Sequence, residues 1–275
     1  MAVTNGWGQG VENNTIDWGK GKNNATNNWG SVYGSSASGD TLLSAASFSN
    51  TYSVSFDGVD QYVNCGDIGG LDGATTASWS CWLYIDDSGD NYVLSQWDGS
   101  SSASNNFMLY VKPSANRFDI YCGSSIGYRR TDITVATGQW HHVVVTFNGG
   151  NTAKDRVILY LNGTQYKQTT YNGATSLKAS PSSDFLIAKR GGFAFYPFEG
   201  EIDEVSIFTS ELTQSQITAL YNSGTPTDLT GHAGIIHWWR MGDVAGGSGS
   251  TITDQVGSNN GTLTNSPTFS TNVPT

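Results

Sequence analysis

Charged residues are scarce in this 275-residue sequence, and basic residues are the scarcer kind. They make up 13% of the chain, with 23 Asp and Glu against 13 Lys and Arg, so the formal net charge is −10. A field of this sign repels a phosphate backbone, and nucleic acid is therefore not an expected partner. An anionic membrane surface is disfavoured for the same reason.

Cysteine and long apolar runs are also scarce. The three cysteines (Cys65, Cys81 and Cys122) are odd in number and far apart, which indicates buried free thiols rather than a disulfide framework and fits a reducing cytosol. The first residues carry no basic region and no apolar run, so we expect no signal peptide. No stretch approaches the ~18 apolar residues of a membrane span, and we expect no membrane insertion.

Glycine and aromatic residues are abundant instead, with 34 Gly, 9 Trp and 12% aromatics. Gly, Asn, Ser and Thr are mediocre helix formers, whereas Thr, Val, Ile and aromatics suit strands and Gly and Asn suit turns. The composition therefore predicts an all-β protein with few helices.

A short repeat sets residues 1–46 apart from the rest. Trp7, Trp18 and Trp29 are spaced 11 apart, and each is followed by Gly. The segment has too few aliphatic residues for a core of its own. We interpret it as an extended arm that docks through these three Trp residues on another subunit or partner. The alternative is a tail that folds back on the following domain.

Strand signals recur at short intervals from Ser47 onward, with Asn162-Gly163 as a strong hairpin turn. This spacing predicts an antiparallel sandwich or jelly roll rather than alternating strands and helices. One helix is expected within residues 211–224, where Thr213 and Gln216 have capping-box spacing and Leu212 and Ile217 have staple spacing. We expect Gly224 to end it. The predicted strands cover residues 51–58, 61–66, 74–86, 91–99, 105–113, 116–123, 139–150, 155–165, 183–192, 199–210, 235–241 and the region 261–269.

Three segments resemble the laminin-G-like, concanavalin A-type jelly-roll family. They are Ser-Phe-Asp-Gly-Val-Asp-Gln-Tyr-Val (55–63), Gly-Gln-Trp-His-His-Val with Leu-Tyr-Leu-Asn-Gly (138–143 and 159–163), and Gly-Glu-Ile-Asp-Glu-Val-Ser-Ile-Phe (200–208). The segment with Trp239-Arg240-Met241-Gly242-Asp243 resembles one that often precedes the Phe-Asp-Gly strand in this family, but here it comes last. We therefore predict one sandwich from 47 to 275, with 232–275 completing it.

The tail and the Trp-Gly repeats are similar, more weakly, to virion proteins of tailed bacteriophages. This resemblance implies a non-enzymatic head decoration or tail-fibre protein, assembled in the host cytoplasm into the virion as a homo-oligomer. The arm would bind other virion proteins, and the lectin-like sandwich would bind host-surface glycan. The alternative is a stand-alone carbohydrate-binding module, and a glycan-degrading enzyme is the third candidate.

Glu201-Ile202-Asp203-Glu204 is the most enzyme-like segment. Laminarinase-like glycosidases share the sandwich and carry Glu-x-Asp-x-x-Glu on one strand, but Ser206 stands where their last Glu is required. Strand alternation places Glu204 on the opposite face from Glu201 and Asp203. The paired-carboxylate mechanism is therefore broken, and we expect no hydrolase.

Two binding sites remain as hypotheses. Asp57, Asp60 and Asp203, with Asp243 and Asp254 in second rank, are candidates for a structural calcium, which the family resemblance implies. The alternative is that Asp57 and Asp60 cap the turn. Glycan binding needs exposed aromatic rings beside polar groups, and the candidates in expected loops are Trp97, Tyr128, Phe193 and Tyr196. The histidines are expected to be structural.

Overall fold

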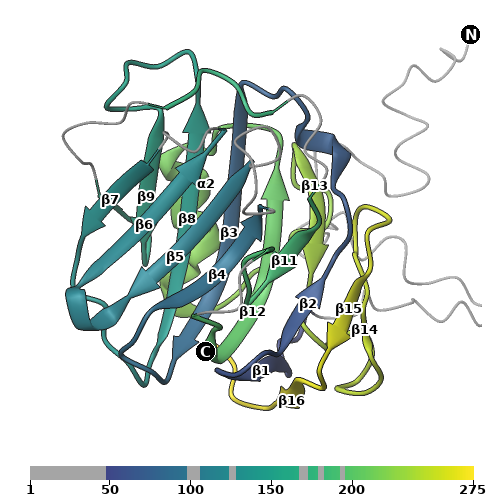
Figure 1. The fold of residues 1–275 in the computed structure, drawn as a ribbon. Coiled ribbons are helices and arrows are strands. Elements are labelled where there is room, and N and C mark those ends of the chain that lie inside the picture. Colours follow the sequence, from purple (N-terminus) through teal and green to yellow (C-terminus); the bar gives the residue numbers. More distant parts are fainter. Residues whose placement is uncertain (1–47, 98–105, 124–127, 167–172, 179–182, 193–195) are drawn as a thin grey trace, which may run out of the picture. The chain divides into compact units, whose positions relative to one another are not determined.

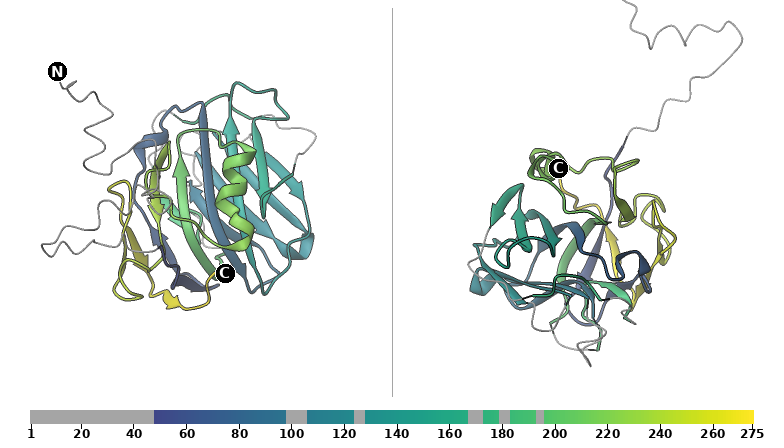
Figure 2. Two further views of the ribbon diagram at one scale, coloured as in Figure 1. Left: turned by 180° about the vertical axis from the view of Figure 1, so that it is seen from behind. Right: turned by 90° about the horizontal axis from the view of Figure 1, so that it is seen from above.

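The computed structural model describes residues 48–97, 106–123, 128–166, 173–178, 183–192 and 196–275 (Figure 1). Phe48–Thr275 form a compact unit, in which two antiparallel sheets pack face to face (Figures 1 and 2). The predicted all-β sandwich with a short helix is confirmed.

The two sheets, named A and B, each hold eight strands within the described residues. In sheet A the order is β10 (Thr164–Tyr166), β9 (Val157–Leu161), β8 (Trp140–Asn148), β3 (Thr76–Ile85), β12 (Glu199–Phe208), β1 (Ser53–Asp57) and β16 (Thr268–Ser270), and β13 (Ile235–Trp239) also pairs with β12. In sheet B the order is β14 (Thr251–Ile252), β15 (Gly261–Thr264), β2 (Tyr62–Asn64), β11 (Phe185–Ile187), β4 (Asn91–Gln96), β5 (Phe107–Lys112), β6 (Arg117–Cys122) and β7 (Tyr128–Asp132).

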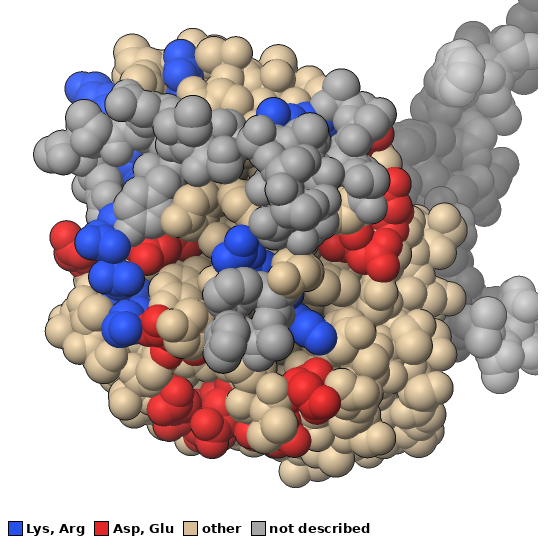
Figure 3. All heavy atoms as spheres, viewed as in Figure 1, with Lys and Arg blue, Asp and Glu red and all other residues tan. Residues whose placement is uncertain are grey.

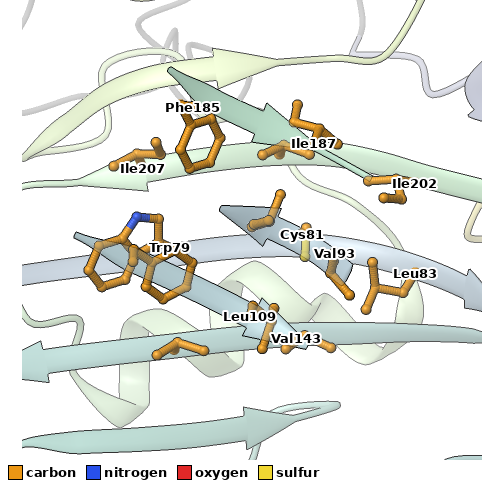
Figure 4. Close-up of a cluster of buried hydrophobic side chains, with 14 of the residues drawn as sticks. Trp79, Cys81, Leu83, Val93, Leu109, Val143, Phe185, Ile187, Ile202 and Ile207 are labelled. Atoms are coloured by element: carbon orange, nitrogen blue, oxygen red, sulfur yellow. The ribbon is translucent and has the colours of Figure 1, made fainter. Parts of the chain in front are cut away.

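The main core lies between the sheets because alternate residues of each strand face inward. Trp79 of β3 stacks on Phe107 of β5 at 3.9 Å between ring centroids, and this contact joins the two sheets. Figure 4 shows side chains from both sheets meeting in this layer. Those labelled there are all buried: Trp79, Cys81, Leu83, Val93, Leu109, Val143, Phe185, Ile187, Ile202 and Ile207.

The outer face of sheet A is covered by α2 (Gln214–Tyr221), which crosses it in the rear view of Figure 2. The predicted capping box is present, with Thr213 accepting from the Gln216 N–H. The helix ends earlier than predicted, because Asn222 takes the left-handed conformation (φ 42°) that we expected of Gly224. A second apolar cluster fills the space below it, formed by Val144, Ile158, Tyr160, Phe208, Leu212, Ile217, Leu220, Leu229 and Trp238.

The C-terminal segment contributes strands to both sheets. β13 pairs with β12 and β16 with β1 in sheet A, while β15 pairs with β2 in sheet B. Residues 251–270 thus extend both sheets at the edges next to β1 and β2, the first two strands of the unit. Short 3-10 turns occur at Gly69–Leu71, Pro113–Ala115 and Asn222–Gly224.

Candidate functional site

The outer face of sheet B carries a concentration of aromatic side chains. Its strands alternate, so that inward residues such as Val63 and Leu109 build the core while their neighbours face out. The outward set, here called the aromatic face, comprises Tyr62, Tyr92, Trp97, Tyr110 and Tyr121. Four of these rings lie in close pairs, with 5.0 Å between the centroids of Tyr92 and Tyr110 and 5.3 Å between those of Trp97 and Tyr121.

A cavity of about 280 Å³ opens on this face. Two aromatic rings, Tyr62 and Trp97, stand in its wall beside the polar Asn64, Asp184 and Lys189. Ser183, Leu186, Gly191 and Gly192 complete the wall. Its volume lies near the lower end of the range of small-molecule sites. An arrangement of flat apolar rings with a few convergent polar groups suits a small polyhydroxylated ligand.

Basic side chains gather on the same face. Lys189 lies with its Nζ 4.0 Å from the centre of the Tyr62 ring, and the Arg190 guanidinium lies 5.4 Å from the Trp97 ring. The backbone at Lys189 is held in place, because Ser95 donates its hydroxyl to the Lys189 carbonyl at 2.8 Å. Figure 3 shows Lys and Arg within this face and Asp and Glu gathered along its lower edge.

Two phenols of the aromatic face, those of Tyr110 and Tyr121, have a pKa above the usual value of tyrosine. Burial raises the pKa of Tyr110, to which the neighbouring Asp90 adds. Burial also raises the pKa of Tyr121, with Asp119 contributing. Both phenols therefore remain neutral.

The structure brings two of the four predicted glycan-binding residues to this face. Trp97 follows β4 directly, and Tyr196, which is 46% exposed, lies 6.2 Å from Tyr92 between ring centroids. Tyr128 begins strand β7, so the expectation that residues 128–130 form a loop is wrong. Phe193 lies outside the described residues, as do Trp7, Trp18 and Trp29 of the predicted arm. Sequence reasoning missed Tyr62 and Lys189, because only strand pairing brings them to Trp97.

The three aspartates predicted to hold calcium are not brought together. Asp57 is paired with Glu199, four residues before Asp203 on β12, which is about 13 Å along a strand. Asp57 caps its own turn, since its Oδ1 accepts from the Val59 N–H at 2.9 Å. The carbonyl of Asp60 accepts from the Asn265 side chain. No group of three metal-binding side chains occurs in the described part of the chain.

The two further calcium candidates, Asp243 and Asp254, accept hydrogen bonds from other groups of the protein. Asp243 accepts from the Thr51 and Tyr52 N–H groups at 2.8 Å. Asp254 accepts from the Trp238 N–H at 3.1 Å and lies 2.7 Å from His237. The predicted structural calcium therefore stays a prediction, without a ligand set.

A β-bulge in β12 changes the direction of Glu204. Ile202 and Val205 both face the core, so that Asp203 and Glu204 between them both face outward. Glu204 has a positive φ of 48°. The expectation that Glu204 points away from Asp203 is therefore wrong.

Both carboxylates of the bulge are buried and bonded within the fold. Glu204 accepts from Trp238 Nε1 at 2.5 Å and from Arg240 Nε at 3.2 Å, and Asp203 accepts from Asn50 at 2.9 Å. Burial raises the pKa of Glu204 to about 7 and raises that of Asp203 well above its usual value, to which the Glu204 charge adds. Asp203 is fully buried and Glu204 4% exposed, so neither can flank a glycosidic bond.

A Ser–His pair lies below α2, and it was not predicted from the sequence. Ser80 Oγ is 2.9 Å from His142 Nε2, because β3 and β8 are paired with Ser80 opposite Val144, which makes Ser80 and His142 diagonal neighbours. The adjoining cavity measures only about 10 Å³, which holds about one water molecule. Burial lowers the pKa of His142 to about 3, which makes it a poor general base at neutral pH. This geometry does not support catalysis.

Comparison with protein-family models identifies the superfamily to which this chain belongs. The model described as the concanavalin A-like lectin/glucanases superfamily, of the laminin-G-like type, matches residues 57–218, more than half of the chain. The chain belongs to this superfamily. The jelly-roll resemblance predicted from the sequence is thereby confirmed.

Solved structures show the same fold at low sequence identity. A candidate carbohydrate-binding protein from Bacteroides ovatus aligns with a TM-score of 0.61 and 20% identity, over 82% of this chain and 62% of that one. The CBM40 module of the Ruminococcus gnavus IT-sialidase, bound to α2,3-sialyllactose, aligns with a TM-score of 0.50 and 13% identity, over 63% of this chain and 100% of that one. This chain thus spans less than two thirds of the Bacteroides protein. A search of curated protein sequences found no match.

Two further findings concern the predicted likeness to virion proteins and the presence of membrane-spanning helices. Nothing in these comparisons supports the predicted likeness to bacteriophage virion proteins. Among the residues that the structure describes, no helix has the length and apolar character needed to span a bilayer.

Proposed function

We propose that Phe48–Thr275 are a carbohydrate-binding module whose ligand site is the cavity on the aromatic face. The observation that carries this proposal is the pairing of Tyr62 and Trp97 with Asn64, Asp184 and Lys189 in one cavity wall. Sugar rings stack their C–H faces on aromatic rings, and their hydroxyls need hydrogen-bond partners at the edge. The cavity offers both in a volume of about 280 Å³, suited to a single sugar unit or a chain end.

The relatives support a binding role. The Bacteroides ovatus protein is described as a candidate carbohydrate-binding protein, and the Ruminococcus gnavus module was solved with a bound sialylated sugar. A non-catalytic role fits the site, because the only carboxylate of the cavity wall among the described residues is Asp184. Glycoside hydrolysis requires two.

The role of the whole chain goes beyond this module. Display of the module on a virion through the Trp-Gly arm is the prediction from sequence, with host-surface glycan as the ligand. The arm lies outside the described residues, and this part stays a prediction. A free-standing carbohydrate-binding module is the version that the relatives favour.

Binding to a panel of immobilised glycans, followed by calorimetry on the best ligand, tests the proposal. Replacing Tyr62 by Ala removes one ring of the cavity wall and should weaken binding about tenfold. The matched control is Tyr84→Ala, because Tyr84 is also a half-buried strand tyrosine but belongs to sheet A. Failure of the wild type to bind any glycan, or equal weakening by both variants with unchanged thermal unfolding, would contradict the site.

A further inference from the structure

The cavity wall is rich in hydrogen-bond donors that lack a partner. Lys189 makes no ion pair within the described residues, where its ammonium contacts only the Tyr62 ring. The Trp97 indole Nε1 is buried and has no acceptor there, although the side chain is only 5% exposed. A buried N–H without an acceptor costs about 1–3 kcal/mol, so a ligand that supplies an acceptor recovers this free energy.

The carboxylate of the cavity wall, that of Asp184, already accepts a hydrogen bond from within the protein. Asp184 accepts from the Asn64 side chain at 2.8 Å. Arg190 adds a second positive charge beside Trp97 and donates to the Tyr92 hydroxyl at 3.2 Å. Within the wall itself, Lys189 is the basic residue and Asp184 is the acidic one, and the Asp184 carboxylate is engaged by Asn64.

A basic residue in the cavity wall contrasts with the charge of the rest of the protein. The whole chain carries a net charge of −10 and only 13 basic residues, one of which, Lys189, lines this cavity. The other basic side chains of the same face are paired, with Lys112 on Asp90 at 2.5 Å and both Arg117 and Arg130 on Asp119 at 3.2 Å. Lys189, by contrast, has no carboxylate partner among the described residues, and its ammonium lies over the Tyr62 ring.

We propose that the cavity selects a sugar that carries a carboxylate, with Lys189 and the Trp97 N–H as the groups that bind it. This inference rests on the proposed function, since it names the ligand class of the same site. A carboxylate oxygen accepts from an indole N–H and an ammonium together, and charge-assisted hydrogen bonds are about twice as strong as neutral ones. A neutral sugar would offer only hydroxyl oxygens to the same two donors.

Matched pairs of ligands test this selectivity. Oligogalacturonate is compared with its methyl ester, and sialyllactose with lactose, by calorimetry on the full chain at neutral pH. The two pairs distinguish a uronic acid from a sialic acid as the source of the carboxylate. We expect one free acid to bind at least about tenfold more tightly than its neutral counterpart.

Two variants assign the effect to the proposed groups. Lys189→Gln keeps a polar side chain and should remove most of the acid preference, measured as the ratio of the affinities for the acid and for its neutral counterpart. Trp97→Phe keeps a ring but removes the N–H, and should reduce the same preference. Lys112→Gln is the control, because Lys112 lies on the same face but is paired with Asp90, and it should leave the preference unchanged. Thermal unfolding of each variant checks that the sandwich is intact.

The outcomes separate this inference from the function that it deepens. Equal binding of acids and neutral counterparts overturns the carboxylate selectivity and leaves the carbohydrate-binding module standing. An acid preference that survives in Lys189→Gln overturns the role of Lys189. Absence of binding to every glycan tested overturns both proposals.

Discussion

The indole N–H of Trp238 on β13 donates to the carboxylate of Glu204 in the β12 bulge, at 2.5 Å. Arg240 bonds the same carboxylate and also Asp243, whose other oxygen holds the backbone of Thr51 and Tyr52. This cluster, here called the carboxylate clasp, ties the start of the unit to its C-terminal strands. Phe48 lies against it, with its ring stacked on Trp238.

The clasp makes stability depend on pH. Burial raises the pKa of Glu204 to about 7 and that of Asp203 well above its usual value, so the folded protein holds these protons more tightly than the unfolded chain. Their contribution to stability is therefore lost as the pH rises through the folded pKa. Burial also lowers the pKa of His142 to about 3, and that of His141, and these two histidines cost stability as the pH falls below about 6.5.

The first prediction is a melting temperature that is nearly level between about pH 4.5 and 6.5 and falls toward pH 8. Between pH 4.5 and 6.5, raising the pH removes the stability contributed by the two carboxyls and restores the stability that the two histidines cost, so the two effects oppose each other. Above pH 6.5 only the effect of the carboxyls remains. The loss from Glu204 is on the order of 1 kcal/mol, a few degrees in melting temperature. Glu204→Gln should reduce this fall. Calorimetry that finds higher stability at pH 8 than at pH 6 would contradict the assignment.

The second prediction concerns Arg240, which neutralises the clasp. Arg240→Ala leaves Glu204 and Asp243 buried without their cation, and should cost about 3 kcal/mol of unfolding free energy. The control is Arg130→Ala, because Arg130 is 45% exposed in its pair with Asp119 and should cost less than about 1 kcal/mol. Urea unfolding measures both, and equal losses would show that the clasp contributes no more than a surface pair.

The third prediction tests a close approach of two loops. A Cβ at Gly149 would lie 1.6 Å from the Thr175 carbonyl oxygen, so Gly149→Ala must displace backbone. We expect a loss above about 2 kcal/mol. At Gly69 nothing lies within 4 Å of an added Cβ, and Gly69→Ala should change stability by less than about 0.5 kcal/mol. Similar urea midpoints for the two variants would mean that the segment carrying Thr175 yields easily.

The fourth prediction separates the arm from the sandwich. Removing residues 1–46 should leave the melting temperature and glycan binding of the rest unchanged, since Phe48 and the clasp are retained. If the arm joins copies of the chain, as its Trp spacing predicts, the full chain should sediment as an oligomer and the truncated chain as a monomer. Identical sedimentation of the two would contradict the docking role.

Sequence patterns predicted most of the sandwich, because strand alternation and turn residues act locally. The capping box of Thr213 and Gln216 could be read in the same way. The bulge at Asp203 and Glu204 could not be predicted from the sequence. A bulge is defined by the register of a strand with its neighbour, and here that neighbour is β3. Strand β7 was missed because its buried positions hold Arg129 and Thr131 where an apolar residue would mark a strand, and only its pairing with β6 shows that these residues lie opposite Ile120 and Phe118 of the core.

The candidate site was accessible to sequence reasoning only in part. Trp97 and Tyr196 were named as aromatics beside polar groups, which is a local property. Their meeting with Tyr62 and Lys189 depends on the order β2-β11-β4 in sheet B, which joins segments more than 100 residues apart in the chain. No local signal encodes that order.

The sequence by itself determined that this protein is an acidic, all-β sandwich with a Trp-Gly segment ahead of it, because composition and strand alternation act through nearest neighbours, and the resemblance of its motifs indicated the lectin-type family. Only the tertiary structure decided that Asp203 and Glu204 are buried on sheet A, and that the aromatic face lies on the other sheet. The reason is that burial and charge pairing depend on residues distant in the chain, such as Trp238 on Glu204 and Lys189 on Tyr62.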